Sequence, residues 1–194
     1  MSDSEQQWAS SQCGAAFVGG ALAGMIASRL LPPLLARAGG MARAAMGRDP
    51  FDELIADHRK LVALLRKMEQ SQGRGRSNAH RMQLLLRFKR RLAAHALAEE
   101  DVAYPLLHDA ADAAEDAKHL YAEHAQMKIH LHALEQMSKD DPGWTARVRA
   151  LRELIEEHAR QEEEVDFPKL RRALDQQAKT RLSGDLSCEK ALIL

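Results

Sequence analysis

Two stretches of the chain, residues 95–107 and 158–170, are near-copies of each other at a shift of 63 positions. The first reads HALAEEDVAYPLL and the second reads HARQEEEVDFPKL. In each copy a histidine is followed by a glutamate four residues later, and an aromatic residue and a proline come near the end. A weaker match at a shift of 66 relates residues 57–70 to residues 123–136, where an acidic residue followed by a histidine recurs. We therefore interpret the chain as a duplicated hairpin of two elements.

The hydrophobic pattern predicts that these elements are helices. Apolar residues recur at three- and four-residue intervals through four long segments, and no segment alternates apolar with polar residues. The pairs Asp49-Pro50 and Asp141-Pro142 open the first and fourth segments, each as an N-cap followed by proline at the first helical position. Short connections then predict an all-α, up-down-up-down four-helix bundle. The predicted helices cover about residues 50–68, 79–104, 112–138 and 142–167, with Pro105 and Pro168 ending the second and fourth.

Composition divides the rest of the chain. We expect a polar N-terminal tail over residues 1–13, an apolar Gly/Ala-rich helical segment over 14–48, the bundle over 49–176 and a C-terminal tail over 177–194. The uncharged run at residues 14–28 is shorter than the roughly 20 residues that a membrane-spanning helix needs. It contains a GxxxG pair, Gly20 and Gly24, and arginines follow it. Residues 14–38 are therefore expected either to rest on an anionic membrane surface or to pack on the bundle or in a homodimer.

Charge and cysteine content narrow the partners and the compartment. The chain has 28 basic and 28 acidic residues, and this zero net charge argues against binding nucleic acid through bulk electrostatics. Its two cysteines, Cys13 and Cys188, form no CxxC motif, which argues against a disulfide framework and against a thiolate zinc site. A reducing compartment fits best, so we expect a cytoplasmic protein.

Polar residues interrupt the apolar stripe of every predicted helix. Each stripe carries a histidine, and the second and fourth also carry a glutamate four residues later. Two residues at this spacing lie about 6 Å apart along one helix face, so both can reach one centre. Beyond the glutamates we expect the stripes to continue through Val102 and Val165. The inward polar set is His58, His95, Glu99, His124, His158 and Glu162.

This inward set is best explained by bound metal. An unpaired buried charge costs several kcal/mol, and histidine–glutamate ion pairs would offset only part of that cost. A pair of divalent cations would satisfy all six groups at once, and their oxygen and nitrogen donors suit iron, manganese or zinc. With two bridging glutamates and two histidines on each ion, the protein supplies about four ligands per ion. The remaining positions are open to water, an oxo or hydroxo group, O2 or nitric oxide, which indicates a reactive centre.

Other polar residues receive weaker assignments. Tyr104 is expected to be a packing residue near the end of the bundle. His119 lies well off the face of His124 and is a poor additional ligand. Four other histidines are expected to be solvated or to contact the ligand residues without binding metal: His80, His108, His130 and His132. Four acidic residues are expected to be solvated, with a weaker alternative that they guide iron inward: Glu100, Asp101, Glu163 and Glu164.

At these residues the sequence resembles the hemerythrin-like, or HHE cation-binding, family. The resemblance covers about residues 50–175 and rests on His58, the HALAE and EEDVAYP run, His124, and the HARQE and EEEVDFP run. It implies a left-handed four-helix bundle with a non-haem di-iron centre, whose ligands are the inward set with Glu99 and Glu162 as bridges. The sequence departs from oxygen-carrying hemerythrins because it lacks an HxxxH pair at His124 and because its last carboxylate is a glutamate.

From the motif and the resemblance we expect a metal-binding protein that binds or reacts with O2, nitric oxide or peroxide, in oxygen or iron sensing, storage or stress protection. Two alternatives remain open. One is an enzyme, either peroxidase-like or donating iron for repair. The other is a metal-stabilised module that recruits a membrane or a partner.

Overall fold

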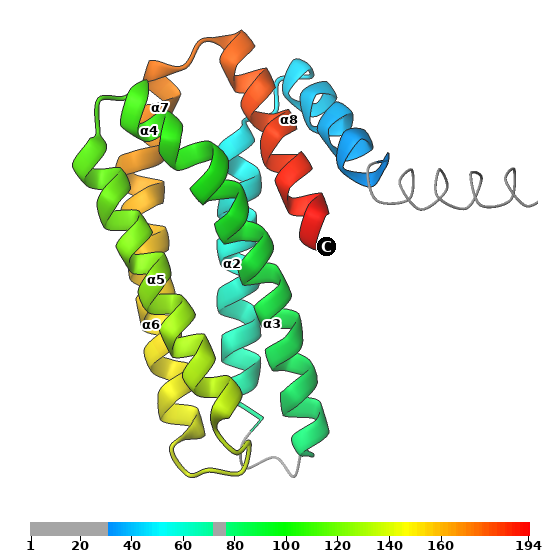
Figure 1. Ribbon diagram of the computed structural model, residues 1–194, viewed down its shortest axis with the longest axis vertical. Coiled ribbons are helices and arrows are strands. Elements are labelled where there is room, and N and C mark those ends of the chain that lie inside the picture. The colour runs from blue at the N-terminus through cyan, green and yellow to red at the C-terminus, as the bar shows by residue number, and fades with distance from the viewer. Residues whose placement is uncertain (1–30, 72–76) are drawn as a thin grey trace, which may run out of the picture.

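The computed structural model describes residues 31–71 and 77–194. All regular secondary structure in these ranges is helical, with turns and short loops between the helices. A helix over residues 31–45 comes first. The bundle follows as α2 (Pro50–Glu69), α3 (Asn78–Ala98), α5 (Ala114–Gln136) and α6 (Trp144–Gln161), which run alternately up and down (Figure 1). No strand occurs in the described ranges. The expected all-α bundle is confirmed. The Gly20–Gly24 pair and Cys13 lie outside the described residues.

The ends of the helices agree with the sequence in some places and differ in others. Asp49 caps α2 by accepting a hydrogen bond of 2.9 Å from the backbone N–H of Phe51, as the Asp-Pro signal predicts. The second Asp-Pro pair does not start α6. Asp141 instead closes a tight turn by accepting from the Gly143 N–H at 2.7 Å, and the helix begins at Trp144.

Neither proline ends its helix. After α3 and α6 the chain makes a wide π turn, η1 (Glu99–Ala103) and η2 (Glu162–Asp166), and then continues as α4 (Tyr104–Asp109) and α7 (Phe167–Ala173). Each proline lies in the first turn of the new α segment, where its missing N–H costs no hydrogen bond. The two π turns occupy equivalent positions in the repeat, so the duplication extends to an uncommon backbone conformation.

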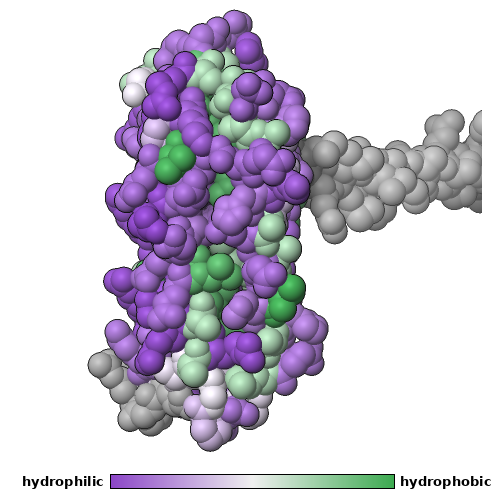
Figure 2. Space-filling view, turned by 90° about the vertical axis from the view of Figure 1, so that its left-hand side faces the viewer, coloured by the Kyte–Doolittle hydropathy of each residue, from purple (hydrophilic) through white to green (hydrophobic). Residues whose placement is uncertain are grey.

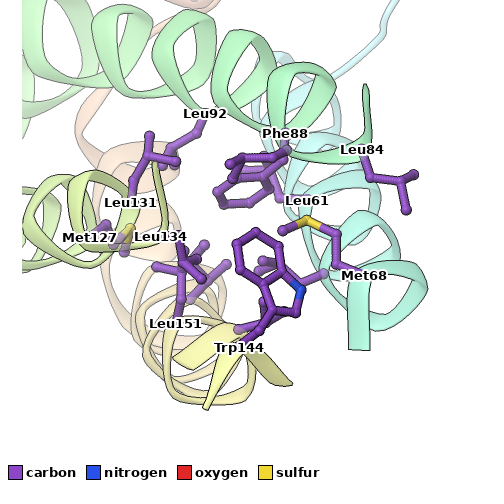
Figure 3. Packing of buried hydrophobic residues seen from close by; sticks show 14 residues of the cluster. Leu61, Met68, Leu84, Phe88, Leu92, Met127, Leu131, Leu134, Trp144 and Leu151 are labelled. Atoms are coloured by element: carbon purple, nitrogen blue, oxygen red, sulfur yellow. The ribbon is translucent and has the colours of Figure 1, made fainter. Parts of the chain in front are cut away.

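Two apolar clusters fill the bundle, one on each side of a polar layer. The cluster nearer the α5–α6 connection has the rings of Phe88 and Trp144 lying together between leucines of all four helices (Figure 3). The second cluster lies at the opposite end and includes Phe51, Tyr104 and Phe167. The predicted inward histidines and glutamates come between the two along every helix, so the polar layer is shielded from both ends of the bundle.

The predicted C-terminal tail is wrong. Residues 176–193 form a helix, α8 (Gln176–Ile193), which lies against α3 and the η1 turn beside the upper part of the bundle (Figure 1). Leu182 and Leu186 join the second apolar cluster. The small residues of α8 face the helix over residues 31–45, where the Ser183 hydroxyl donates to the Gly40 carbonyl at 2.9 Å. The buried face of α8 consists partly of serine and glycine, so the hydrophobic pattern of the sequence did not indicate a packed helix there.

Outside the core, the molecule presents charged faces. The side drawn in Figure 2 is largely hydrophilic, and its hydrophobic residues form separate small areas. Larger exposed apolar side chains occur on the first helix, where Leu31, Leu34 and Leu35 are half or more exposed. Within the described ranges, no helix has the length and apolar character needed to cross a membrane.

Candidate metal centre

The structure brings all six predicted inward residues together in the middle of the bundle. The four histidines come from four different helices, and each glutamate is the first residue of a π turn. All six side chains are at most 2% exposed. They are His58 on α2, His95 on α3, Glu99 on η1, His124 on α5, His158 on α6 and Glu162 on η2.

Each glutamate lies between two histidines. Glu99 Oε2 is 3.0 Å from His95 Nε2 and 3.4 Å from His124 Nε2. Glu162 Oε2 has the equivalent position in the other half of the repeat. It lies 3.1 Å from the Nε2 atom of His58 and 3.4 Å from that of His158. The two halves also touch, since the Nε2 atoms of His124 and His158 are 3.2 Å apart.

The π turns change the inward face beyond the glutamates. We expected Val102 and Val165 to continue the stripes, but Val102 is only partly buried and Val165 is 37% exposed. The extra residue in each wide turn rotates the following residues, so the aromatic residue five positions after each glutamate points inward instead. Tyr104 and Phe167 are both buried at the edge of the polar layer for this reason.

Tyr104 therefore belongs to the centre as well as to the core, which corrects the packing assignment. Its hydroxyl donates a hydrogen bond of 2.9 Å to Glu162 Oε1 and lies 3.0 Å from His124 Nε2. Burial, with the nearby charges of Glu162 and Glu99, raises the pKa of Tyr104 well above 10. The hydroxyl thus remains a hydrogen-bond donor. Its placement depends on the π turn, which the hydrophobic spacing does not reveal.

In three of the four histidines, the Nδ1 atom, which faces away from the centre, contacts a carboxylate. His58 Nδ1 lies 2.9 Å from Glu163, and His124 Nδ1 lies 2.9 Å from Glu100. These two glutamates are equivalent in the repeat and follow the inward glutamates directly. Their assignment as solvated acidic residues is therefore wrong, and their recurrence in both copies was the signal that could have revealed the role. Such partners fix the orientation of a ligand imidazole and increase its basicity.

The third of these carboxylates is Glu123, whose Oε2 lies 2.8 Å from His158 Nδ1. Its other oxygen lies 3.2 Å from His119 Nε2. His119 is largely exposed and lies outside the polar layer, and within the described ranges it is linked to that layer through Glu123. The fourth histidine, His95, differs from the others because its Nδ1 has no hydrogen-bond partner among the described residues.

These partners separate the pKa values of the histidines. Burial opposes protonation of His58, but its contacts with Glu162 and Glu163 outweigh it and raise the pKa from 6.5 to about 10. Burial likewise opposes protonation of His124, and Glu100 and Glu99 raise its pKa to about 9. Burial and the charges of the neighbouring histidines lower the pKa of His95 well below 6.5.

The pKa values of the two inward glutamates also differ. Burial opposes ionisation of Glu162, but the charges of His158, His58 and His124 lower its pKa to about 2. For Glu99, burial and the charge of Glu162 raise the pKa. At neutral pH the metal-free protein therefore holds protonated His58 and His124 together with an ionised Glu162.

The donor set fits divalent cations. Atoms of five residues, His58, His95, Glu99, His158 and Glu162, lie within 4.8 Å of one another. The Nε2 atoms of His58 and His95, both oxygens of Glu99 and one oxygen of Glu162 are buried and lack a hydrogen bond of acceptable geometry within the described part of the chain. Unsatisfied buried donors and acceptors of this kind are costly, and a metal ion would satisfy them together.

The remaining histidines take no direct part. His108 and His132 are exposed, and His80 and His130 are half-buried on other parts of the bundle. The structure thus separates the four predicted ligand histidines from the other five, with His119 linked to them through one carboxylate.

Comparison with known proteins supports the same assignment. The chain is 29% identical over 142 residues to a protein named DNA nickase from Nostoc sp. (strain PCC 7120), which covers 73% of this chain. The match spans 39% of the length of that relative. No solved structure matches the chain. Residues 43–170 match the family described as "Hemerythrin HHE cation binding domain". The buried histidine–glutamate cluster fits the metal binding of that family, and the chain belongs to the hemerythrin HHE cation-binding domain family.

Proposed function

We propose that the chain holds a pair of non-haem iron ions and that this centre binds or reacts with O2, nitric oxide or peroxide. The observation that carries the proposal is the set of buried, unsatisfied nitrogen and oxygen atoms that face one another in the polar layer. His58, His95, His124 and His158 would be terminal ligands. Glu99 and Glu162 would bridge the ions, together with an oxo or hydroxo group or water. Manganese or zinc would suit the same donors.

When bound, iron would supply one-electron redox chemistry and coordination positions for a small ligand, because six protein groups do not fill the shells of two ions. The chain's own residues prepare the site for this. Glu100, Glu123 and Glu163 hold three imidazoles with Nε2 turned inward. The apolar clusters on both sides limit access of water. Tyr104 keeps a proton next to Glu162.

Such a centre suits a sensor, a store or a protective scavenger. A purely structural metal site is usually closed by its protein ligands, whereas an incomplete ligand set favours reaction with a small molecule. Iron donation for repair and peroxidase-like turnover would use the same residues, so the fate of the bound ligand decides between binding and turnover.

The first experiment is metal analysis and an absorption spectrum of the protein purified after iron-supplemented expression. We expect about two iron ions per chain, the number that the six buried groups can hold. The Glu99→Ala/Glu162→Ala double variant should lose the iron, and Glu157→Ala, at an exposed position of α6, is the matched control. Less than one metal ion per chain, with folding unaffected by the double change, would contradict the proposal.

A second measurement separates binding from chemistry. The reduced, iron-loaded protein is mixed with O2 and then flushed with argon. A spectral change that reverses supports binding, whereas immediate and permanent oxidation supports turnover. Repeating the test with nitric oxide and with peroxide identifies the preferred ligand.

We further propose that residues 14–38 dock on a membrane surface or on a second copy of the chain, because the leucines of their described part face outward. Sedimentation with anionic vesicles, compared between the full chain and a chain lacking residues 1–48, tests the first outcome. Sedimentation velocity without vesicles tests the second. A monomer that stays free of vesicles would contradict both.

DNA is not the partner that we propose. The relative is named a DNA nickase, but the match covers a minor part of its length, and the charges of this chain sum to zero. Incubation of the iron-loaded protein with supercoiled plasmid should leave the plasmid intact. Nicking that disappears in the Glu99→Ala/Glu162→Ala variant would overturn this expectation.

A further inference from the structure

The two halves of the repeat hold their histidines by the same rule, with one exception. Glu100 of the first copy bonds to His124, and the equivalent Glu163 of the second copy bonds to His58. By the second repeat relation, Glu123 on α5 corresponds to Asp57 on α2. Since Glu123 bonds to His158, the repeat predicts that Asp57 bonds to His95.

Asp57 bonds elsewhere. One oxygen accepts a hydrogen bond of 2.7 Å from Lys190 and the other accepts one of 2.7 Å from Lys60. His95 Nδ1, which would be its counterpart by symmetry, has no hydrogen-bond partner among the described residues although the side chain is 2% exposed. Asp57 is also one methylene shorter than Glu123, so its carboxylate does not bond to His95 while Lys190 holds it.

Lys190 comes from α8, which lies beyond the residues matched to the family. It is 6% exposed, and its ammonium also lies 3.6 Å from Glu53. The end of the helix is fixed by Arg90, which donates to the Leu194 carbonyl at 2.6 Å. A charged lysine buried at this depth is normally retained only with partners, and here the partner is the carboxylate that the repeat assigns to His95.

The space beside His95 is too small for any partner larger than one water molecule. Asp57, Lys190 and His95 line one small cavity of about 10 Å³, with Lys60, Arg91, Ala94 and Leu194 as its other walls. A cavity of this size is close to the smallest that holds one water molecule, so it has no room for a second carboxylate. The cations on its walls are unsuited to accept a hydrogen bond from an imidazole N–H.

We propose that Lys190 is a positioning residue of the metal centre: by holding Asp57, it leaves His95 without a carboxylate partner and makes His95 the most weakly held ligand. The ion that takes His95 is then the more exchangeable of the two. This inference rests on the proposed di-metal function. Loss of such an outer partner costs about 10–100-fold in metal affinity, so the two ions should bind with affinities that differ by about that factor.

The test is an anaerobic titration of the full chain and its variants with Fe²⁺ alone, monitored by calorimetry. The unchanged protein should show two binding steps of unequal affinity. Asp57→Asn should leave both steps in place, because it removes no partner from a histidine. Glu123→Gln should weaken the tighter step about 10–100-fold, because it frees His158. Two equal steps, or Asp57→Asn weakening binding as much as Glu123→Gln, would overturn the inference while leaving the di-metal function intact. No binding at all would refute both.

Two further variants test Lys190 itself. Lys190→Met should release Asp57 toward His95 and bring the two affinities together. Lys179→Met, the same change on the same helix, is the control. Because removal of Lys190 can also loosen α8, Asp57→Glu provides a second route, since the longer side chain can reach His95 while Lys190 stays in place. If neither variant narrows the difference between the steps, the inference is wrong.

NMR spectroscopy can detect directly whether each histidine Nδ1–H is hydrogen-bonded to a carboxylate. In the zinc-loaded protein with ¹⁵N-labelled histidine, the Nδ1–H protons of His58, His124 and His158 should resonate downfield and exchange slowly with solvent. The His95 proton should not join them until Asp57→Glu is introduced. A fourth slowly exchanging proton in the unchanged chain would refute the proposed difference.

Discussion

The Tyr104 hydroxyl and the Glu162 carboxylate, which come from opposite halves of the repeat, meet across the polar layer in a hydrogen bond of 2.9 Å. The residue equivalent to Tyr104 is Phe167, whose ring stacks on that of His58 at a centroid distance of 6.2 Å. The duplication thus provides two aromatic positions at the edge of the centre, and only one of them carries a proton donor. The two halves of the polar layer are consequently unequal on this side as well as at His95.

Changing Tyr104 to Phe should destabilise the metal-free protein and spare metal binding. The change removes a donor to a buried, ionised Glu162, and hydrogen bonds to charged groups contribute about 1.5–3 kcal/mol to the free energy of unfolding. It also frees His124 Nε2, so two ions should still bind. Urea unfolding of the metal-free protein measures the loss, with Tyr121→Phe at a partly exposed ring as the control. An equal loss in both variants would argue against a special role for Tyr104.

Glu100→Gln and Glu163→Gln should each weaken metal binding by about 10–100-fold, because each removes the carboxylate that orients a ligand histidine. Glu164→Gln, next in sequence but with a side chain 67% exposed, should leave the affinity unchanged. Competition with a chromophoric chelator gives the three values. Equal affinities in all three variants would show that the Nδ1 bonds do not support the ligands.

The sequence predicted the six inward residues because hydrophobic spacing is a local property, and because a repeated histidine–glutamate pair on an apolar stripe is costly to bury without a bound cation. It did not predict what depends on contacts between helices. Glu100 looks like a surface residue until α5 brings His124 to it, and Lys190 looks like part of a tail until α8 docks. The π turns were missed for another reason, since one extra residue in a turn leaves no mark on the spacing before it and misplaces every position after it, including Val165.

The stability of the metal-free protein should fall as the pH rises from about 6.5 to about 10. The folded pKa values of His58 and His124, about 10 and about 9, lie above the ordinary value of 6.5. Their contribution is fully present below pH 6.5, where both the folded and the unfolded states are protonated, and is lost as the pH passes the folded values. Thermal unfolding of the metal-free protein at several pH values measures this. A His58→Gln/His124→Gln variant should have a flatter profile over the same range.

Metal binding should release protons at pH 7.5 for the same reason. His58 and His124 are protonated in the metal-free protein at this pH, and only neutral imidazole binds a metal ion. Calorimetry in two buffers of different ionisation enthalpy counts the protons, and the apparent affinity should rise with pH. Binding without proton release would show that both histidines are already neutral.

Gly40→Ala should loosen the helix over residues 31–45 from α8. A Cβ at this position would meet the Ser183 carbonyl and lie 2.5 Å from Ser187 Oγ, and the backbone of a packed helix cannot yield as the end of a side chain can. Overpacking of this kind costs about 1–3 kcal/mol. Gly39→Ala is the matched control, because its Cβ would meet only the end of Arg43, at 3.5 Å, and alanine favours a helix by roughly 0.5–1 kcal/mol over glycine. Amide hydrogen exchange of residues 31–45 should therefore speed up in the first variant and slow or stay unchanged in the second. Equal exchange in the two variants would mean that the close approach at Gly40 does not hold the helices together.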